Sequence, residues 1–420
     1  MVKINFDAKR HILNNKLQVV TINKDTQLSS LNLGVKVGAL YESQDEKGVA
    51  HFIEHMLFKG TKLRSNEQLN CELENLGGEY NAYTDYTSTV YSITCLQEEI
   101  ENALELLSDM IINPVFESKE MRKERGVILS EIRTSKDDIE DLSFRRTSDF
   151  AFKNSGLKYD IMGTEDSVAS FKKEDLRSFY NKYYSPTNTI LTFVSSYSHE
   201  EAIKIVKKYF GLWENKSVVS TSFVFEKNNH GVFESYKTDM EQTTITYLFA
   251  FEEIPKEMEL PLRILNHKLG ESSNSLLFRE LRENRGLSYD VYTHLDVSKY
   301  VKTLHIFTSV DEDSVKEVMD VIDKCIDDIK HKKIIFDDST FSLMKKVHKT
   351  AVVSTLEDPT DLGNYCLHQL LEDEDIYEFI EDMEELDKLK PEDIYEVSQF
   401  LLNDPTIHIL KSCEREEKLE

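Results

Sequence analysis

The chain has 420 residues, of which 40% are hydrophobic and 30% are charged, a composition typical of a folded globular protein and unlike a disordered one. This length exceeds one ordinary hydrophobic core and predicts two or three domains. The 77 acidic residues outnumber the 51 basic ones, and the formal net charge of −26 argues against nucleic acid and anionic membranes as partners.

Cysteine usage and apolar stretches indicate the compartment. The five cysteines are odd in number, lack CxxC spacing and are spread over the chain, which favours reduced thiols over disulfides or a thiolate metal site. No stretch approaches the roughly 18 apolar residues of a membrane span, and the first residues contain no apolar leader. We therefore expect a cytoplasmic protein with no membrane partner.

The first elements along the chain are expected to be strands over residues 17–22 and 31–37, where apolar and polar residues alternate. Three helices are expected after them, from about Glu46 to Lys59, from Ser65 to Gly77-Gly78, and from about Ser118 to Thr134. Ser65 and Gln68 have the spacing of a capping box, which marks the start of the second helix.

The two halves of the sequence resemble each other. Residues 74–84 align with residues 283–293, and six of these eleven positions are identical. A second echo pairs residues 174–176 with residues 392–394, in the same order and at nearly the same offset. Two such echoes favour an internal duplication. We expect a first domain over 1–215, a linker over 216–235 and a homologous second domain over 236–420.

The segment His51-Phe52-Ile53-Glu54-His55 is an HxxEH motif. Residues four apart share one face of a helix, so both imidazoles can reach one metal ion. Zinc accepts imidazole nitrogens, and with three protein ligands it keeps a position for water. Glu54, next to both histidines, is placed to act as base toward that water, which is the HExxH arrangement in reverse order. The spacing alone leaves open a solvated helix face with incidental histidines, and it does not identify a third ligand.

The residues around this motif resemble the pitrilysin/insulinase family of zinc metallopeptidases, the inverzincins, which includes the mitochondrial processing peptidases. Four segments carry the resemblance, in the family's order: residues 48–61, 78–84, 124–132 and 281–289. The resemblance covers most of the chain and is weakest over 212–235 and from about 345 to 390.

The resemblance implies a role for each matching residue. Glu131 would be the third zinc ligand, and Glu124 would be a carboxylate that supports the ligands. On the residues alone, Glu124 could instead form a surface ion pair with Arg122 or Arg125. Arg282 and Tyr289 would hold and polarise the substrate carbonyl, although Tyr289 alone would read as a half-buried strand tyrosine. Asn81, Ala82 and Tyr83 would form an edge strand to which an extended peptide adds.

Departures from the family pattern refine this expectation. The positions equivalent to the metal site in the second half are Leu260, Arg263 and Ile264, so that half cannot bind zinc. The loop over 270–275 has little glycine, unlike that of the noncatalytic mitochondrial processing subunit, which points to a bacterial two-domain member. In that type, two chains resemble the halves of a clam-shell around a chamber.

Duplication and resemblance together predict an α+β fold of two duplicated two-layer α/β sandwich domains. Each would have an antiparallel or mixed sheet with helices on one face, and the second domain would be a metal-less repeat. We expect a zinc-dependent endopeptidase with one Zn²⁺ per chain, acting on short or unfolded peptides, with basic ones favoured by the acidic chain. A homodimer is expected. The alternatives are a noncatalytic scaffold and one subunit of an obligate heterodimer.

Overall fold

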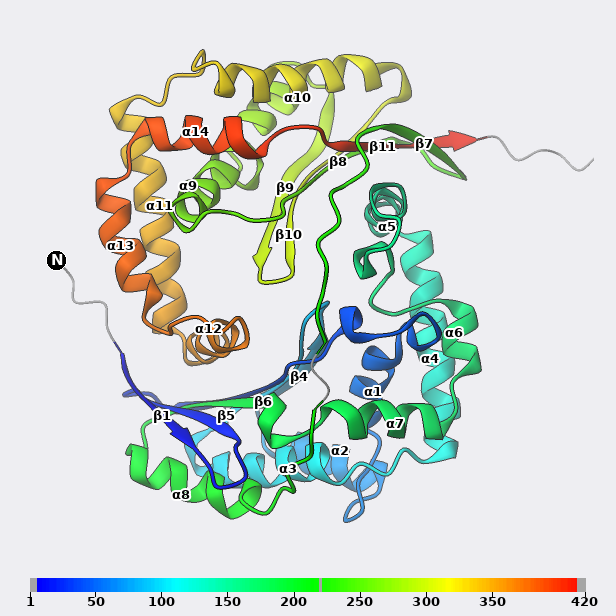
Figure 1. Cartoon of the computed structure of the whole chain (residues 1–420), viewed down its shortest axis with the longest axis vertical. Coiled ribbons are helices and arrows are strands. Elements are labelled where there is room, and N and C mark those ends of the chain that lie inside the picture. The colour runs from blue at the N-terminus through cyan, green and yellow to red at the C-terminus, as the bar shows by residue number, and fades with distance from the viewer. Residues whose placement is uncertain (1–5, 219–220, 414–420) are drawn as a thin grey trace, which may run out of the picture. The chain divides into compact units, whose positions relative to one another are not determined.

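The computed structural model describes residues 6–218 and 221–413 (Figure 1). Contacts within the chain divide it into two compact units. Unit 1 comprises the residues up to Arg133, then Asp160–Phe223 and Ala351–Ile380, and unit 2 comprises Thr134–Tyr159, Val224–Thr350 and the residues from Glu381 on. Each unit therefore includes a segment from the other half of the sequence.

Unit 1 is built on a six-stranded mixed sheet. Its strands are β1 (Asp7–Ile12), β2 (Gln18–Asn23), β3 (Leu28–Val35), β4 (Glu79–Thr84), β5 (Thr89–Leu96) and β6 (Thr189–Ser195). They lie in the order β1-β2-β6-β3-β5-β4, and only β2 and β6 run parallel. Strand β4 therefore ends the sheet and pairs with β5 alone among the described strands.

Unit 2 is built on a five-stranded sheet with the same connectivity. Its strands are β7 (Gly231–Thr238), β8 (Thr243–Ala250), β9 (Ser288–Ser298), β10 (Val301–Val310) and β11 (Thr406–Cys413). The order β7-β11-β8-β10-β9, with β7 and β11 parallel and the rest antiparallel, reproduces β2-β6-β3-β5-β4 strand for strand. This match agrees with the expected duplication, and the α+β fold class of two sheet-based domains is confirmed.

One face of the first sheet is covered by helices that form the main core of unit 1. The helices of this unit are α1 (Val49–Leu57), α2 (Asn66–Asn75), α3 (Ile100–Ile112), most of α4 (Ser118–Asp137), α6 (Glu165–Ser170), α7 (Lys173–Tyr183), α8 (His199–Phe210) and α12 (Pro359–Leu371). Leu191 and Phe193 of β6 face this core, whereas Ile190 and Val194 face a second apolar cluster. Strand β6 is buried on both sides because α12 covers the second face.

Unit 2 likewise receives a helix from the first half of the sequence. Its helices are α5 (Ile139–Ala151), α9 (Lys256–Asn266), α10 (Val315–Lys330), most of α11 (Asp338–Glu357), most of α13 (Glu378–Lys388) and α14 (Pro391–Leu401). Helix α5 packs on β8 and β11, and Ser143 of α5 shares a buried hydrogen bond with Thr244 of β8. Helices α9, α10 and α14 contribute to the main core of this unit.

Several expected elements are present with shifted boundaries. The capping box of Ser65 and Gln68 starts α2 as expected. The first helix starts at Val49 instead of near Glu46, because Gly48 has a left-handed backbone with φ of 90°. A Cβ at Gly48 would also lie 2.3 Å from the carbonyl oxygen of Met162.

The compact units differ from a division into continuous domains 1–215 and 236–420, because α5 and α12 each pack on the sheet of the other half. Helix α12 also adds a layer to the first domain, where helices were expected on one face only. The expected linker 216–235 extends into β7, which begins at Gly231. Within the described part of the chain, no helix is long and apolar enough to cross a bilayer.

Candidate metal centre

Helix α1 presents three of the expected site residues on the face opposite its apolar stripe. Its stripe residues Val49, Phe52, Ile53 and Met56 are 0–1% exposed and lie in the core of unit 1. This packing fixes the rotation of the helix, so His51, Glu54 and His55 emerge together on the other side.

The N-terminus of α1 is held by a buried carboxylate that the sequence analysis did not identify. The Glu42 side chain accepts the backbone N–H groups of Gly48 and Ala50, each at 2.9 Å, and Lys47 donates to the Glu42 carbonyl. Burial raises the pKa of Glu42 to about 8, although the two backbone donors and Lys47 oppose this rise. An acidic residue seven positions before a helix is a weak sequence signal.

Glu131 of α4 joins the two histidines in one cluster. The Nε2 atoms of His51 and His55 lie 3.3 Å apart, and the Glu131 carboxylate lies 3.9 Å from the first and 3.7 Å from the second. Ligand atoms around tetrahedral zinc, at bond lengths of about 2.0–2.2 Å, are separated by roughly 3.3–3.6 Å. The histidine pair lies within this range and the carboxylate lies only slightly beyond it, so two imidazoles and a carboxylate in this arrangement fit one zinc ion after a small side-chain movement. Among the described residues, this is the one cluster of histidines, cysteines and carboxylates close enough to hold a metal.

The pKa values of the two histidines shift in opposite directions. Burial, reinforced by the nearby His55, lowers the pKa of His51 to about 3, so its ring is neutral. Burial alone would lower the pKa of His55 too, but the hydrogen bond to Glu124 and the surrounding carboxylates raise it. His55 Nδ1 lies 3.2 Å from the Glu124 carboxylate. This contact favours the tautomer that leaves Nε2 free for a metal.

Glu124 is held in place from a second direction. Its other carboxylate oxygen lies 2.9 Å from Nζ of Lys59, and the Glu124 side chain is 8% exposed. Burial raises the pKa of Glu124, but the bonds from His55 and Lys59 outweigh it and the net shift is downward. The observed partners are thus His55 and Lys59, and Arg125 instead donates to the carbonyls of Val168 and Phe171. The alternative ion pair with Arg122 or Arg125 is not formed.

Glu54 stands beside the cluster without belonging to it. Its carboxylate accepts a hydrogen bond of 2.7 Å from the hydroxyl of Thr84, at the end of β4. Burial raises the pKa of Glu54, opposed by Thr84 and by the charge of His55. A partly buried, oriented carboxylate whose pKa is raised is a better proton acceptor and donor than an exposed one.

The expected substrate strand lies at the sheet edge. Asn81 and Ala82 are on β4, whose outer side carries no strand among the described residues. The Tyr83 hydroxyl is 2.7 Å from Nε2 of His368 on α12. His368 was absent from the sequence analysis because 285 residues separate it from Tyr83.

Arg282 and Tyr289 contact each other in unit 2. The Arg282 guanidinium stacks on the Tyr289 ring at 4.4 Å and donates to the Tyr289 carbonyl at 3.1 Å. The Tyr289 residue is 74% exposed, so it is not a half-buried strand tyrosine. In the same unit, Leu260 and Ile264 of α9 are buried in the core, as their apolar character requires.

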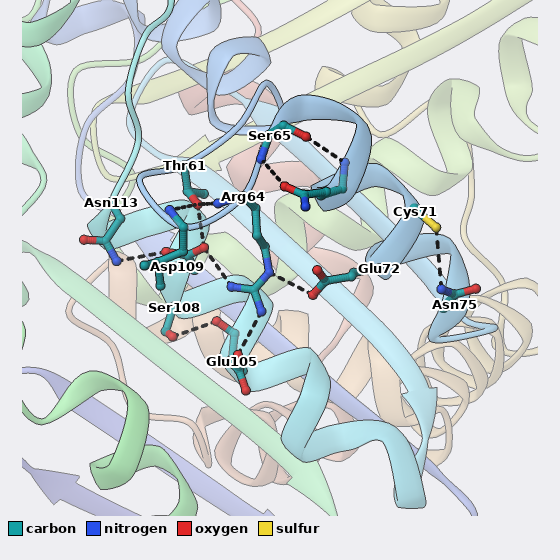
Figure 2. Close-up of polar contacts among 12 residues, drawn as sticks. Thr61, Arg64, Ser65, Cys71, Glu72, Asn75, Glu105, Ser108, Asp109 and Asn113 are labelled. Atoms are coloured by element: carbon teal, nitrogen blue, oxygen red, sulfur yellow. Dashed lines mark hydrogen bonds and ion pairs between the residues drawn. The ribbon is translucent and has the colours of Figure 1, made fainter.

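The loop after α1 is tied to the next two helices by Arg64 (Figure 2). Its guanidinium contacts Glu72 of α2 at 2.8 Å and Glu105 and Asp109 of α3 at 2.8 and 2.9 Å. The Thr61 hydroxyl also donates to Asp109, at 2.6 Å. These bonds hold the C-terminal side of the HxxEH helix, as Glu42 holds its N-terminal side.

Two family models match successive parts of the chain. Residues 18–165 match the family model described as Insulinase (Peptidase family M16). Residues 170–346 match the model described as Peptidase M16 inactive domain. The first match contains His51, Glu54, His55 and Glu131, and the second contains Arg282 and Tyr289.

Individual proteins named as proteases or peptidases are similar to the chain in sequence or in fold. A Rickettsia felis protein named "uncharacterized zinc protease" is 32% identical over 342 residues, covering 80% of this chain and 81% of its own. Mitochondrial-processing peptidase subunit beta of Bos taurus is 33% identical over 199 residues, covering 47% of this chain and 41% of its own. A crystal structure of a protease from Helicobacter pylori covers 97% of this chain and 99% of its own, with a TM-score of 0.89 at 21% identity. At that identity, the last likeness shows the fold alone.

Proposed function

The chain belongs to the insulinase family of peptidases, and we propose that it is a zinc-dependent endopeptidase that hydrolyses short or unfolded peptides. Its relatives include proteins named as zinc proteases. The observation that carries the proposal is the convergence of His51, His55 and Glu131 within 4.8 Å, with Glu54 beside them.

In the proposed reaction, His51, His55 and Glu131 hold one zinc ion, which when bound supplies a Lewis acid and lowers the pKa of water. Glu54 takes a proton from the attacking water and returns it to the leaving amine. Thr84 orients Glu54 through its hydroxyl, which donates to the carboxylate. Arg282 and Tyr289 bind and polarise the substrate carbonyl.

Substrate selection follows from the edge strand and the charge. An extended peptide can add to the outer side of β4, the strand of Asn81, Ala82 and Tyr83, through main-chain hydrogen bonds. Such binding reads peptide conformation more than side chains, so we expect broad specificity. The net charge of −26 favours basic peptides.

For assembly, we propose a homodimer in which two chains enclose a chamber, in the cytoplasm. The alternatives are a heterodimer with a related chain and a noncatalytic scaffold. The complete HxxEH set favours a catalytic chain over a scaffold. The presence of Arg282 and Tyr289 in the same chain as the zinc ligands favours a homodimer over a heterodimer.

The test combines metal removal with two matched substitutions. Phenanthroline should abolish cleavage of a mixed peptide library, followed by mass spectrometry, and added zinc should restore it. Glu54→Gln should keep stoichiometric zinc but lose at least about a hundredfold in turnover, because it removes the base and leaves the ligands. Glu131→Gln should lower zinc occupancy. Full cleavage by metal-free protein would refute the zinc peptidase, and wild-type zinc affinity in Glu131→Gln would refute this third ligand.

A further inference from the structure

The end of β4 is held from both faces of the sheet. Successive residues of a strand point to opposite faces, so Tyr83 and Thr84 project in opposite directions. Thr84 donates to Glu54 on the α1 side, at 2.7 Å. Tyr83 bonds His368 of α12 on the other side, also at 2.7 Å. The Tyr83 and His368 rings are nearly parallel, at 12°, with centroids 6.2 Å apart.

Helix α12 is held against the sheet by hydrogen bonds and close packing, so the position of His368 is fixed. The Thr192 hydroxyl of β6 donates to the carbonyl of Gly363 at 2.9 Å. Thr360, near the start of the helix, shares a 3.0 Å hydrogen bond with Thr94 of β5. A Cβ at Gly34 of β3 would lie 3.0–3.2 Å from the side chains of Leu367 and Leu371, so the helix packs closely there.

Because β4 is an edge strand, its end needs a contact such as that from His368 to hold it in place. A strand with one neighbour receives ladder hydrogen bonds on one side only, so its end moves more easily than that of a central strand. A shift of β4 at Thr84 would move the hydroxyl that orients Glu54. Small displacements of a catalytic base reduce turnover strongly.

We propose that His368 is a positioning residue of the peptidase site: through the Tyr83 hydroxyl it fixes the end of β4, and with it the Thr84 hydroxyl that holds Glu54. A helix from the second half of the sequence thereby completes the site built on the first half. This inference rests on the proposed function for its effect on turnover. Its effect on the mobility of β4 is independent of that function.

The experiment is a double-substitution cycle with a conservative variant and a matched control. His368→Leu and Tyr83→Phe each remove the shared hydrogen bond and keep an apolar body of similar size. His368→Gln keeps a nitrogen donor near the position of Nε2. Thr360→Val removes another hydrogen bond between α12 and the sheet, one that reaches β5 instead of β4. The readouts are kcat/KM on a peptide, zinc affinity by chelator competition, and amide hydrogen exchange over residues 79–84.

Each single loss of the bond should lower kcat/KM roughly three- to tenfold, the effect of one hydrogen bond, with zinc affinity unchanged. The double variant should be no worse than either single variant, because both remove the same contact. Exchange over β4 should quicken in both single variants, and His368→Gln should recover much of the loss. Thr360→Val should change exchange and kcat/KM much less than either, because the Thr192–Gly363 bond and the packing against Gly34 still hold α12.

Additive losses in the double variant, or unchanged exchange over β4, would overturn the positioning role while leaving the peptidase intact. Loss of zinc together with activity would also overturn it, since the contact would then be supporting the whole domain. A wild-type protein that cleaves no peptide would refute the proposed function. Exchange over β4 would still decide whether His368 fixes the strand.

Discussion

The two histidines of the cluster differ in what supports their rings. His55 Nδ1 is bonded to Glu124, which Lys59 holds in turn. The Nδ1 atom of His51 is buried and has no hydrogen-bond partner among the described residues. The orientation of His51 therefore depends on packing within α1, whereas that of His55 depends on a polar chain from α4. Metal affinity should be sensitive to this polar chain.

The residue-scale prediction concerns Glu124. Glu124→Gln removes the charge that orients and polarises His55, so zinc affinity should fall about 10- to 100-fold. The control is Glu120→Gln, one turn earlier on α4, where the buried carboxylate pairs with Lys123 and Asn66 and touches no ligand. Chelator competition with a zinc indicator measures both. Equal losses in the two variants would mean that charge in general, and not the bond to His55, sets the affinity.

Some site residues could be predicted from local spacing, one only from the family resemblance, and others not at all. The i, i+4 spacing was enough to predict that His51 and His55 share a helix face, and the structure places them so. Spacing could not choose a third ligand, because nothing local links residue 131 to residue 55, and that choice came from the family resemblance. Thr84 and His368 act through contacts with residues distant in the sequence, so no periodicity indicates them. Glu42 contacts residues six and eight positions later, at a spacing that marks no regular element.

At the scale of elements, local sequence signals predicted where helices and strands begin and end better than they predicted which helix covers which face of a sheet. The capping box at Ser65 and the stripe of α1 follow from nearest neighbours along a helix. The position of α12 follows from a long-range contact between halves. A signal was nonetheless present, because the run Thr189–Ser195 has apolar residues at both odd and even positions, as strands covered on both faces do.

The element-scale prediction compares two glycines on helices. A Cβ at Gly363 of α12 would lie 2.3 Å from Nδ2 of the buried Asn32, whereas a Cβ at Gly126 of α4 would meet nothing within 4 Å. Gly363→Ala should destabilise unit 1 by about 1–3 kcal/mol through overpacking. Gly126→Ala should stabilise by about 0.5–1 kcal/mol through helix propensity. Urea unfolding monitors both, and stabilisation by Gly363→Ala would contradict the close packing of α12.

At the scale of the whole molecule, the duplicated sheets carry different chemistry. The strand order β2-β6-β3-β5-β4 recurs as β7-β11-β8-β10-β9, yet among the residues that the structure describes only the first copy has the His-His-Glu set. The second copy instead presents the stacked Arg282 and Tyr289. Two sheets of the same strand order thus carry different groups, candidate metal ligands in one and an exposed cation and phenol in the other. The proposed reaction needs both sets of groups.

Subunit mixing tests whether these two sets meet within one chain or between two. Glu54→Gln removes the base in unit 1, and Tyr289→Phe removes only the phenolic hydroxyl in unit 2, leaving the ring on which Arg282 stacks. Each variant alone should be nearly inactive. If sites form between chains, a mixed dimer places both lesions in one site and leaves the other intact. Random exchange makes half of the dimers mixed, so activity should return to roughly one quarter of wild type.

If each site forms within one chain, every site keeps one lesion and mixing restores nothing. Subunit exchange must therefore be demonstrated independently, with differently tagged chains recovered in one dimer. Two Glu54→Gln preparations with different tags provide the control, because their mixed dimers contain no intact site in either arrangement. Absence of recovery with proven exchange would reject the arrangement between chains and leave the zinc peptidase in place. Recovery in the control would instead reveal wild-type contamination, because no pairing of Glu54→Gln chains can supply the missing base.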